Sequence, residues 1–495
     1  MSAYAITDGL SDYLKNNTER VYSVSLMLSV IASIAIFHEL PVLSNLSYLA
    51  IWSLMIAALF NPAIGLVSLF PVLYILPSAP TVLGWPEISF AALLLISSLS
   101  TVVHHSRELV NLFITKSNVV IWLGLVLTGA NYWVAMRHDI PISDWIRGIV
   151  PFLFIYFTII FFLVLKSDRV FKYFFVMSIA VTALLFSFRV IETYVSNSLW
   201  EPSSYIFEYG KWVHIPLEKL ANYDAGSVYN FPIRVTILLQ QSTDVLVPIG
   251  VVWGVIGAVL LSKKKQRIFF GLLAVTSLIA IILTYTRSML LSAGIVVFFS
   301  GLFFLYLGWP FIKRYLIMLC ILGVLAIVSI KITGLEEVYK NRFNQLTNVT
   351  VNNDNVTVKD DNLTARLEEY KIAWDMFLEA PILGKGLGIK HEMNFSAGFG
   401  EILKQKVAYV HNWVFYFLMV SGVAGFVYYS IILGGPALIA LFSSDASVFF
   451  RMTILGTVGF MAIYGLFFAV FRLIPFNLLL ATILAYAMLQ KAEKA

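Results

Sequence analysis

The sequence has little cysteine and little charge, and both shortages exclude classes of protein. Cys320 is the only cysteine and lies within an apolar run, which excludes an intramolecular disulfide and argues against a thiolate-bound metal. Charged residues make up 13% of the chain and hydrophobic residues 59%, against about 25% and about 45–50% in soluble domains. These proportions exclude a soluble enzyme and leave a polytopic helical membrane protein.

Three further absences bear on fold and chemistry. No alternating strand pattern is present, so the membrane spans must be helices, because backbone groups in hydrocarbon need partners within their own segment. The basic residues separate apolar runs instead of forming one stripe, so nucleic acid is not an expected partner. His391 and Glu392 lack the second histidine of a zinc protease motif, and no outer loop holds paired aspartates. We therefore expect no metal and no cofactor.

The sequence has instead about fourteen apolar runs. They predict an all-α integral membrane protein, a bundle of about 14 transmembrane helices with two large periplasmic loops. The division between the second and third spans depends only on Asn61 and Pro62. The predicted spans are residues 21–37, 45–60, 62–78, 88–103, 118–135, 148–165, 171–192, 244–262, 267–284, 289–309, 313–331, 411–431, 449–470 and 476–490.

Lysine and arginine in short loops predict the orientation, because these residues are enriched on the cytoplasmic side. With the N-terminus inside, 16 of them fall in inner loops and 4 in outer loops. We therefore expect both termini in the cytoplasm. The inner residues are Lys15, Arg20, Arg107, Lys116, Lys166, Arg169, Lys172, Lys263, Lys264, Lys265, Arg267, Lys313, Arg314, Arg451, Lys491 and Lys494, and the outer ones are Arg137, Arg147, Arg287 and Arg472.

Two long segments interrupt the series of spans and fall on the outer side. Residues 193–243 and 332–410 are the two predicted periplasmic loops. The rest of the chain then divides into N-terminal transmembrane helices over 1–192, central ones over 244–331 and C-terminal ones over 411–495.

The second predicted loop contains an amphipathic helix. The segment TARLEEYKIAWDMFLEAP spaces its apolar residues mostly three to four apart, with Thr364 as the expected N-cap and Pro381 as the stop. Such a helix suits a membrane surface. The LGKGLG that follows at 383–388 lacks the spacing of a phosphate-binding loop, and we interpret it as a helix-terminating turn.

Four charged or titratable residues on the outer side are candidates for chemistry. They are Arg234, Arg287, Arg366 and His411. Arginine presents a planar fork of donors that matches phosphate oxygens, so arginines converging at a membrane surface suit a lipid diphosphate. Histidine titrates near neutral pH, so His411 is the candidate to accept a proton from an attacking hydroxyl or to donate one to a leaving group.

Each candidate also has a structural interpretation. Arg234 and Arg287 can extend from helix ends to lipid headgroups. Arg366 can be a solvated helix residue that pairs with Glu369 or Tyr370. His411 can be an ordinary residue at a helix start, with Asn412 satisfying the backbone. Arg189 and Arg472, near other helix ends, are left as structural.

The segments around these residues resemble the O-antigen ligase and O-antigen polymerase superfamily of bacterial envelope glycosyltransferases. The resemblance spans roughly residues 230–435. Its most specific elements are W-x-x-F-x-x-x-P-x-x-G-x-G from Trp374 to Gly386, with slightly altered spacing, and the His-Asn pair that opens a helix running into S-G-V-A-G. ILLQQSTDVLVP after Arg234 and the helix start YTRSMLL also match.

The resemblance implies an enzyme of the bacterial inner membrane. The donor would be a glycan on undecaprenyl diphosphate, the acceptor a sugar hydroxyl on another glycan or on lipid A core, and the reaction a metal-independent, inverting transfer at the periplasmic face. Arg287 and Arg366 would hold the diphosphate, with Arg234 a less certain third, and His411 would help to activate the acceptor. The partners implied are therefore these two substrates and membrane lipids.

Two alternatives stay open from the sequence. The family motifs serve polymerases and ligases alike, and about fourteen spans lean slightly toward a polymerase. A ligase that glycosylates proteins is less favoured, since nothing marks a pilin-binding segment. A transporter, in particular a flippase of lipid-linked oligosaccharides, also has many helices and basic residues, but such carriers show two related halves with interrupted helices. This chain shows one charge-poor half and one long external loop.

Overall fold

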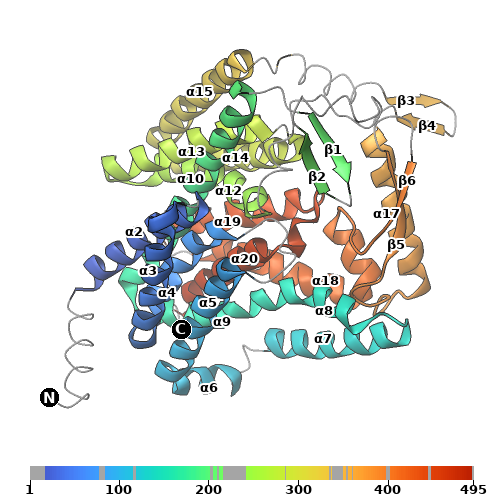
Figure 1. The fold of residues 1–495 in the computed structure, drawn as a ribbon, viewed down its shortest axis with the longest axis horizontal. Helices are drawn as coiled ribbons and strands as arrows, with labels where there is room; N and C mark the ends of the chain where they lie inside the picture. Colours follow the sequence, from blue (N-terminus) through green and yellow to red (C-terminus); the bar gives the residue numbers. More distant parts are fainter. Residues whose placement is uncertain are drawn as a thin grey trace.

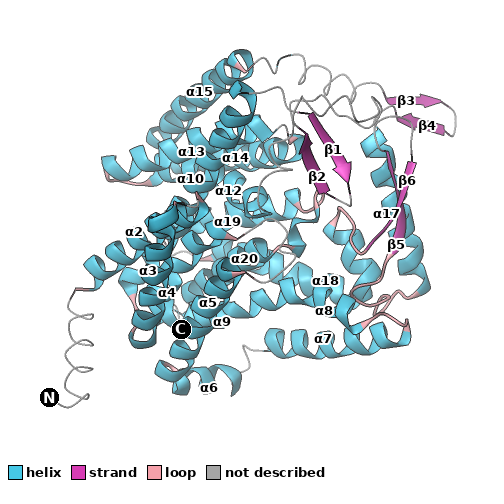
Figure 2. Ribbon diagram, viewed as in Figure 1, coloured by secondary structure: helices cyan, strands magenta, loops and turns pink. Residues whose placement is uncertain are grey.

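The computed structural model describes most of the chain and is almost entirely helical. Figure 2 shows helices throughout, with strands confined to short hairpins at one side. The residues described are 17–38, 40–76, 84–114, 119–200, 204–208, 211–215, 241–284, 286–333, 336, 349–352, 355–358, 361–396, 402–443 and 447–492. The predicted fold class, an all-α polytopic membrane protein, is confirmed.

In Figure 1 the helices before the first predicted loop, coloured blue to green, lie toward the left and along the lower edge, and the last of them packs among the later helices. Pro151 and a short 3-10 segment interrupt the predicted sixth span, so that it consists of two helices in line. The elements are α2 (Thr18–Phe37), α3 (Pro41–Phe60), α4 (Pro62–Val72), η1 (Leu73–Ile75), α5 (Trp85–His104), α6 (Ser106–Ile114), α7 (Val119–Arg137), α8 (Ile142–Leu153), η3 (Phe154–Phe157), α9 (Thr158–Ser167) and α10 (Arg169–Trp200).

The remaining elements form the centre and the opposite side. The centre of the bundle is made by α12 and α20, whose membrane windows are 83% and 78% buried. The elements are β1 (Ser204–Glu208), β2 (Lys211–Ile215), α12 (Gln241–Leu260), α13 (Lys264–Thr284), α14 (Arg287–Leu307), α15 (Trp309–Ile332), β3 (Val349–Asn352), β4 (Asn355–Val358), α17 (Asp361–Glu379), β5 (His391–Ser396), β6 (Ile402–Val407), α18 (Trp413–Phe442), α19 (Val448–Tyr464), η5 (Ala469–Arg472) and α20 (Ile474–Ala492).

The number of full-length spans is smaller than predicted. Among the described residues, twelve helices are long and apolar enough to cross a membrane, and two further apolar helices are shorter. These two are α4 with η1 and α19, at the third and thirteenth predicted positions. Asn61 ends α3 and its side chain accepts from the Ala63 backbone amide at 3.0 Å, which starts α4 anew. All of α4 is buried, so it packs as an internal helix too short to span.

The hairpins and α17 lie at one end of the molecule. Figure 1 shows them toward the right, with the C-terminal end of α20 toward the left. The three hairpins, β1–β2, β3–β4 and β5–β6, are antiparallel. Arg169, Lys263 and Gln266 border a single surface groove, and Lys166 and Lys491 border another. Residues assigned to different cytoplasmic loops therefore border the same grooves.

The amphipathic helix predicted in the second loop is present as α17, with a different start. It begins at Asp361, so Thr364 lies inside the helix and is not its N-cap. The polar residues before Thr364 continue the helical hydrogen bonding, which a local capping pattern cannot reveal. The helix ends at Glu379, two residues before Pro381, and the glycine-containing segment that follows is a turn, as predicted.

This turn crosses α18 where that helix is broken. Gly422 has φ 60° and ψ −163° inside α18. The backbone amides of Lys385 and Gly386 donate to the carbonyls of Met419 and Val420 at 2.9 and 3.0 Å. In return, two amides just after the break, those of Val423 and Ala424, donate to carbonyls at the start of the turn, those of Pro381 and Ile382, at 2.8 and 3.2 Å. The carbonyls and amides released by the break are thereby satisfied.

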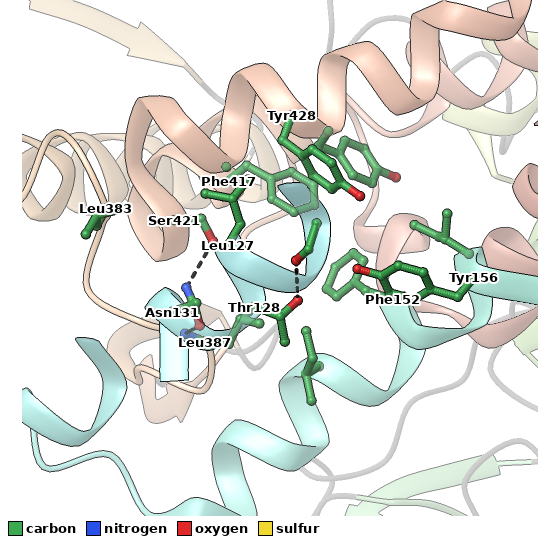
Figure 3. Close-up of a pocket in the computed structure, with 15 residues that line it drawn as sticks. Leu127, Thr128, Asn131, Phe152, Tyr156, Leu383, Leu387, Phe417, Ser421 and Tyr428 are labelled. Carbon is green, nitrogen blue, oxygen red and sulfur yellow. Dashed lines mark hydrogen bonds between the residues drawn. The ribbon is translucent and has the colours of Figure 1, made fainter. Parts of the chain in front are cut away.

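Asn131 attaches α7 to this crossing. Its side-chain amide donates to the Val420 carbonyl at 2.8 Å and to Ser421 Oγ at 3.1 Å, and its Oδ1 accepts from the Leu387 backbone amide and from Trp145 Nε1. Figure 3 shows Asn131 directed at Ser421. Because the membrane window of α7 is only 22% buried, this buried polar residue is a main attachment of α7 to the rest of the bundle.

Replacing Gly422 by alanine should destabilise the protein. A Cβ at this position would lie 2.4 Å from the carbonyl carbon and oxygen of Ile382, and the backbone conformation is one that only glycine adopts readily. We expect a loss of about 3 kcal/mol in the free energy of unfolding, measured as a lower thermal midpoint in detergent. Gly434→Ala is the matched control, since its Cβ meets no atom within 4 Å. Equal midpoints for the two variants would contradict the packing described.

Candidate functional site

Arg366 holds α17 to the segment that follows α19. Its Nη1 donates to the carbonyl of Phe467 at 2.6 Å. One turn further, the hydroxyl of Tyr370 donates to the neighbouring Leu466 carbonyl at 3.3 Å, and the Tyr370 ring stacks on Phe415 of α18 at 4.9 Å. Arg366 is therefore fixed by tertiary contacts and is not a freely solvated helix residue.

His411 lies immediately before α18 and faces α17. Its Nδ1 is 3.1 and 3.2 Å from the two carboxylate oxygens of Glu369. The His411 side chain is 17% exposed and that of Glu369 is 0% exposed. Asn412 caps α18, accepting from the Val414 amide at 2.9 Å, as the structural interpretation expected. Since Asn412 does the capping, the imidazole of His411 is available for another role.

Aromatic rings surround the imidazole of His411. The Tyr409 ring meets it edge-on at 5.0 Å, and the Phe468 ring lies 5.9 Å away. Burial raises the pKa of Tyr409, and the charge of Glu369 raises it further, so its phenol stays protonated at neutral pH. Among the described residues, the imidazole of His411 therefore contacts one buried carboxylate and two aromatic rings.

Arg287 opens α14, which borders the same segment. Ser288, the next residue, lies beside Tyr464, whose buried hydroxyl is also within electrostatic range of Arg366. The Tyr464 ring stacks on that of Phe468 at 5.8 Å. The start of α14, the first half of α17 and the start of α18 thus meet around residues 464–468. This is how the structure brings together the elements that carry three of the four predicted residues; Arg234 lies outside the described residues.

Three residues that the sequence interpretation left out of the site belong to this cluster. Glu369 is the first. Arg472 of η5 is the second, with its guanidinium 5.5 Å from the Tyr409 ring and 5.7 Å from the Tyr416 ring. His391 of β5 is the third: it is buried, and neither ring nitrogen has a hydrogen-bond partner within the described part of the chain.

Burial determines the charge state of His391. It lowers the pKa of this histidine, and the nearby charge of Glu369 only partly opposes that effect. Because the pKa is below the usual range of histidine, the imidazole is neutral at neutral pH. His391 therefore does not neutralise Glu369. Within the described residues, no group of three or more His, Cys, Asp or Glu side chains is placed to hold a metal ion.

An apolar pocket lies one aromatic layer from this cluster. It is formed by α7, α8, η3, the glycine turn and α18, and Figure 3 shows Leu127, Phe152, Tyr156, Phe417 and Tyr428 around it. Phe152 and Phe417 in its wall contact the Tyr416 ring, and the guanidinium of Arg472 lies over that ring, 5.7 Å from its centroid. A second pocket shares Tyr156 and Tyr428 and continues to Lys166 and Lys491.

Residues 272–430 match the family model described as O-antigen ligase. The matched region contains Arg287, Arg366 and His411, together with Glu369, the crossing of the glycine turn and most of α18. No curated protein matches the chain. The match confirms the resemblance to the O-antigen ligase and polymerase superfamily.

Proposed function

We propose, from the O-antigen ligase region at residues 272–430, that this protein transfers a glycan from undecaprenyl diphosphate to a sugar hydroxyl at the periplasmic face of the bacterial inner membrane. The observation that carries the proposal is the meeting of Arg366 with the His411–Glu369 pair beside residues 464–468. This arrangement combines an anion-binding group and a proton acceptor, the two groups that glycosyl transfer from a diphosphate requires.

In this proposal the diphosphate binds to Arg366 and Arg287, with Arg234 as a third ligand. Arg366 uses one nitrogen to hold the Phe467 carbonyl, and a guanidinium has five N–H donors in a fixed plane. The remaining donors are thereby oriented by the protein before the substrate arrives. Such preorganisation stabilises the charge that develops on the leaving diphosphate.

His411 is the proposed proton acceptor. The acceptor hydroxyl gives its proton to the imidazole as its oxygen forms a bond to the anomeric carbon. The bond between that carbon and the diphosphate oxygen breaks, and its electron pair leaves with the diphosphate. A single displacement of this kind inverts the anomeric configuration and calls for no metal ion, because the arginines supply the positive charge.

The apolar pockets support a lipid-linked donor. The two pockets that share Tyr156 and Tyr428 are lined mainly by aliphatic and aromatic side chains along α7 and α18. A polyprenyl tail is a long apolar chain and suits such a lining. Its diphosphate end would then lie close to the aromatic layer of Tyr416 and Arg472.

The proposal includes the orientation and division of the chain. Both termini are cytoplasmic, and residues 193–243 and 332–410 are periplasmic loops between the helices of 1–192, 244–331 and 411–495. The observation in support is that Arg169 and Lys263 border one groove, and Lys166 and Lys491 another, as cations of cytoplasmic loops should.

The acceptor is another lipid-linked glycan if the protein is a polymerase and lipid A core if it is a ligase.

Transfer by purified protein tests this function. Detergent-solubilised protein, mixed with a glycan on undecaprenyl diphosphate and an acceptor of either type, should release undecaprenyl diphosphate and form a longer glycan, also in the presence of a chelator. No membrane gradient or second compartment is needed, so product formation would contradict the alternative of a flippase, which forms none. Translocation of the donor in sealed vesicles without any product would instead contradict the proposed transferase.

A further inference from the structure

Glu369 is a buried carboxylate that lies within hydrogen-bond distance of His411. It lies on the face of α17 that packs toward α18, is 0% exposed, and within the described residues His411 is the one group within hydrogen-bond distance of it. An ionised carboxylate removed from water is costly unless it is paired. The burial of this carboxylate therefore depends on its pairing with His411.

The contact determines which nitrogen of His411 can react. An ionised carboxylate only accepts hydrogen bonds, so Nδ1 of His411 carries the hydrogen in this pair. In the neutral imidazole, Nε2 then has the free lone pair and is the atom able to take a proton. The 17% of the side chain that is exposed leaves the ring accessible to a substrate.

Among the described residues, no other charged or titratable side chain forms a hydrogen bond or an ion pair with either member of the pair. His391, from β5, is neutral and has no hydrogen-bond partner in the described part of the chain. Arg366, on the same helix as Glu369, donates to the Phe467 carbonyl. Tyr409 presents its ring to His411 at an interplanar angle of 85°, which limits rotation of the imidazole, and Arg472 lies over the Tyr409 ring.

We propose that Glu369 is a positioning residue for His411: it fixes the tautomer and ring orientation that present Nε2 to the acceptor hydroxyl. This inference rests on the proposed function, in which His411 accepts the proton. When the imidazole becomes positively charged during transfer, the buried carboxylate 3.1 Å away stabilises that charge. Glu369 thus acts through His411 and does not touch the substrate.

Glu369→Gln tests this role. The amide keeps the size of the side chain but not its charge, so we expect kcat to fall by about 10²-fold, less than the about 10⁴-fold known for a comparable aspartate-to-asparagine change in a serine protease, while KM for the lipid-linked donor changes less than about threefold. Glu368→Gln is the matched control, since it removes the same charge from an exposed position one residue away and should leave both constants unchanged. Wild-type kcat for Glu369→Gln would overturn the inference.

A double-mutant cycle with His411→Gln separates positioning from general structure. If Glu369 acts through His411, the double variant should be no slower than His411→Gln alone. If the rate losses of the two single variants multiply in the double variant, the role of Glu369 is overturned and His411 remains the base. Full activity of His411→Gln would instead overturn the proposed function. If Glu369→Gln does not fold, Glu369→Asp takes its place: its carboxylate is one methylene further from the imidazole, and it should slow transfer only when His411 is present.

Discussion

Substituting His411 by glutamine should lower the rate of glycan transfer by about 10²–10⁴-fold, the usual contribution of a general base. Glutamine has a similar reach and still hydrogen-bonds to Glu369, but it lacks a titratable nitrogen. Because Asn412 caps α18 through its own side chain, the helix start does not depend on residue 411. We therefore expect the variant to fold and to bind the lipid-linked donor normally.

The measurement is transfer from purified donor between about pH 5 and pH 9, the range that spans histidine titration, with donor affinity measured separately. A base must be unprotonated to act, so transfer by the wild type should decline toward acid pH. The glutamine variant should be slow throughout. His138→Gln, at an exposed position, is the control and should behave as the wild type. Wild-type turnover with an unchanged pH profile in the His411 variant would end its assignment as a base.

Arg366→Lys should lose most transfer activity, by about 10²-fold or more, although the positive charge is kept. The guanidinium donates to the Phe467 carbonyl through Nη1 and has other donors pointing elsewhere. A lysine ammonium is a single nitrogen, so it can hold the carbonyl or approach the diphosphate in a fixed geometry, but it cannot do both. The loss should appear as weaker donor binding together with lower kcat.

Arg147→Lys is the control for this substitution. Arg147 is 82% exposed, and its ion pair with Asp144 is long, at 3.9 Å. A lysine at this position should therefore leave transfer unchanged. Arg287→Lys should resemble Arg366→Lys, because the same bidentate requirement applies to both residues in the proposed site. Near-normal glycan length and amount in both variants would contradict a diphosphate clamp and favour contacts of these arginines with lipid headgroups.

The sequence predicted the fold well where apolar runs decide it. Twelve of the fourteen predicted spans correspond to helices, or helices in line, that are long enough to cross a membrane. The two exceptions, α4 and α19, are also apolar helices, but each is shorter than the 18 residues needed to cross a membrane. They differ from the spans in length and not in burial, since α12 and α20 are 83% and 78% buried and are still long enough to span. The ends of helices are the part of a structure that a local sequence pattern predicts least well.

The candidate site could be proposed in part from the sequence. Arg287, Arg366 and His411 were singled out because cations are rare among apolar runs and because the surrounding motifs resemble a known family, and the structure brings together the elements that carry them. Glu369 was missed because its partner is 42 positions further along the chain, and next to Glu368 it resembles an ordinary solvated helix residue. Spacing gave one signal: Glu369 follows Arg366 by three residues, which places both on one face of α17. Arg472 gave the same signal as Arg287, a cation between apolar runs on the outer side, but it was interpreted as structural, and the sequence around His391 indicated only that a zinc motif is incomplete.

The backbone hydrogen bonds between the glycine turn and broken α18 restrict which parts of this protein can vary in length. Backbone amides and carbonyls at residues 381–386 form four hydrogen bonds with backbone carbonyls and amides at residues 419–424. An insertion or deletion of a single residue between the paired positions of either segment would shift one set of these pairs against the other and leave polar backbone groups unpaired, some of them beside the buried Met419 and Val420. The lengths of the two segments are therefore fixed together with their glycines, since a Cβ at Gly384 or Gly422 would lie 2.4 Å from backbone atoms of the other segment.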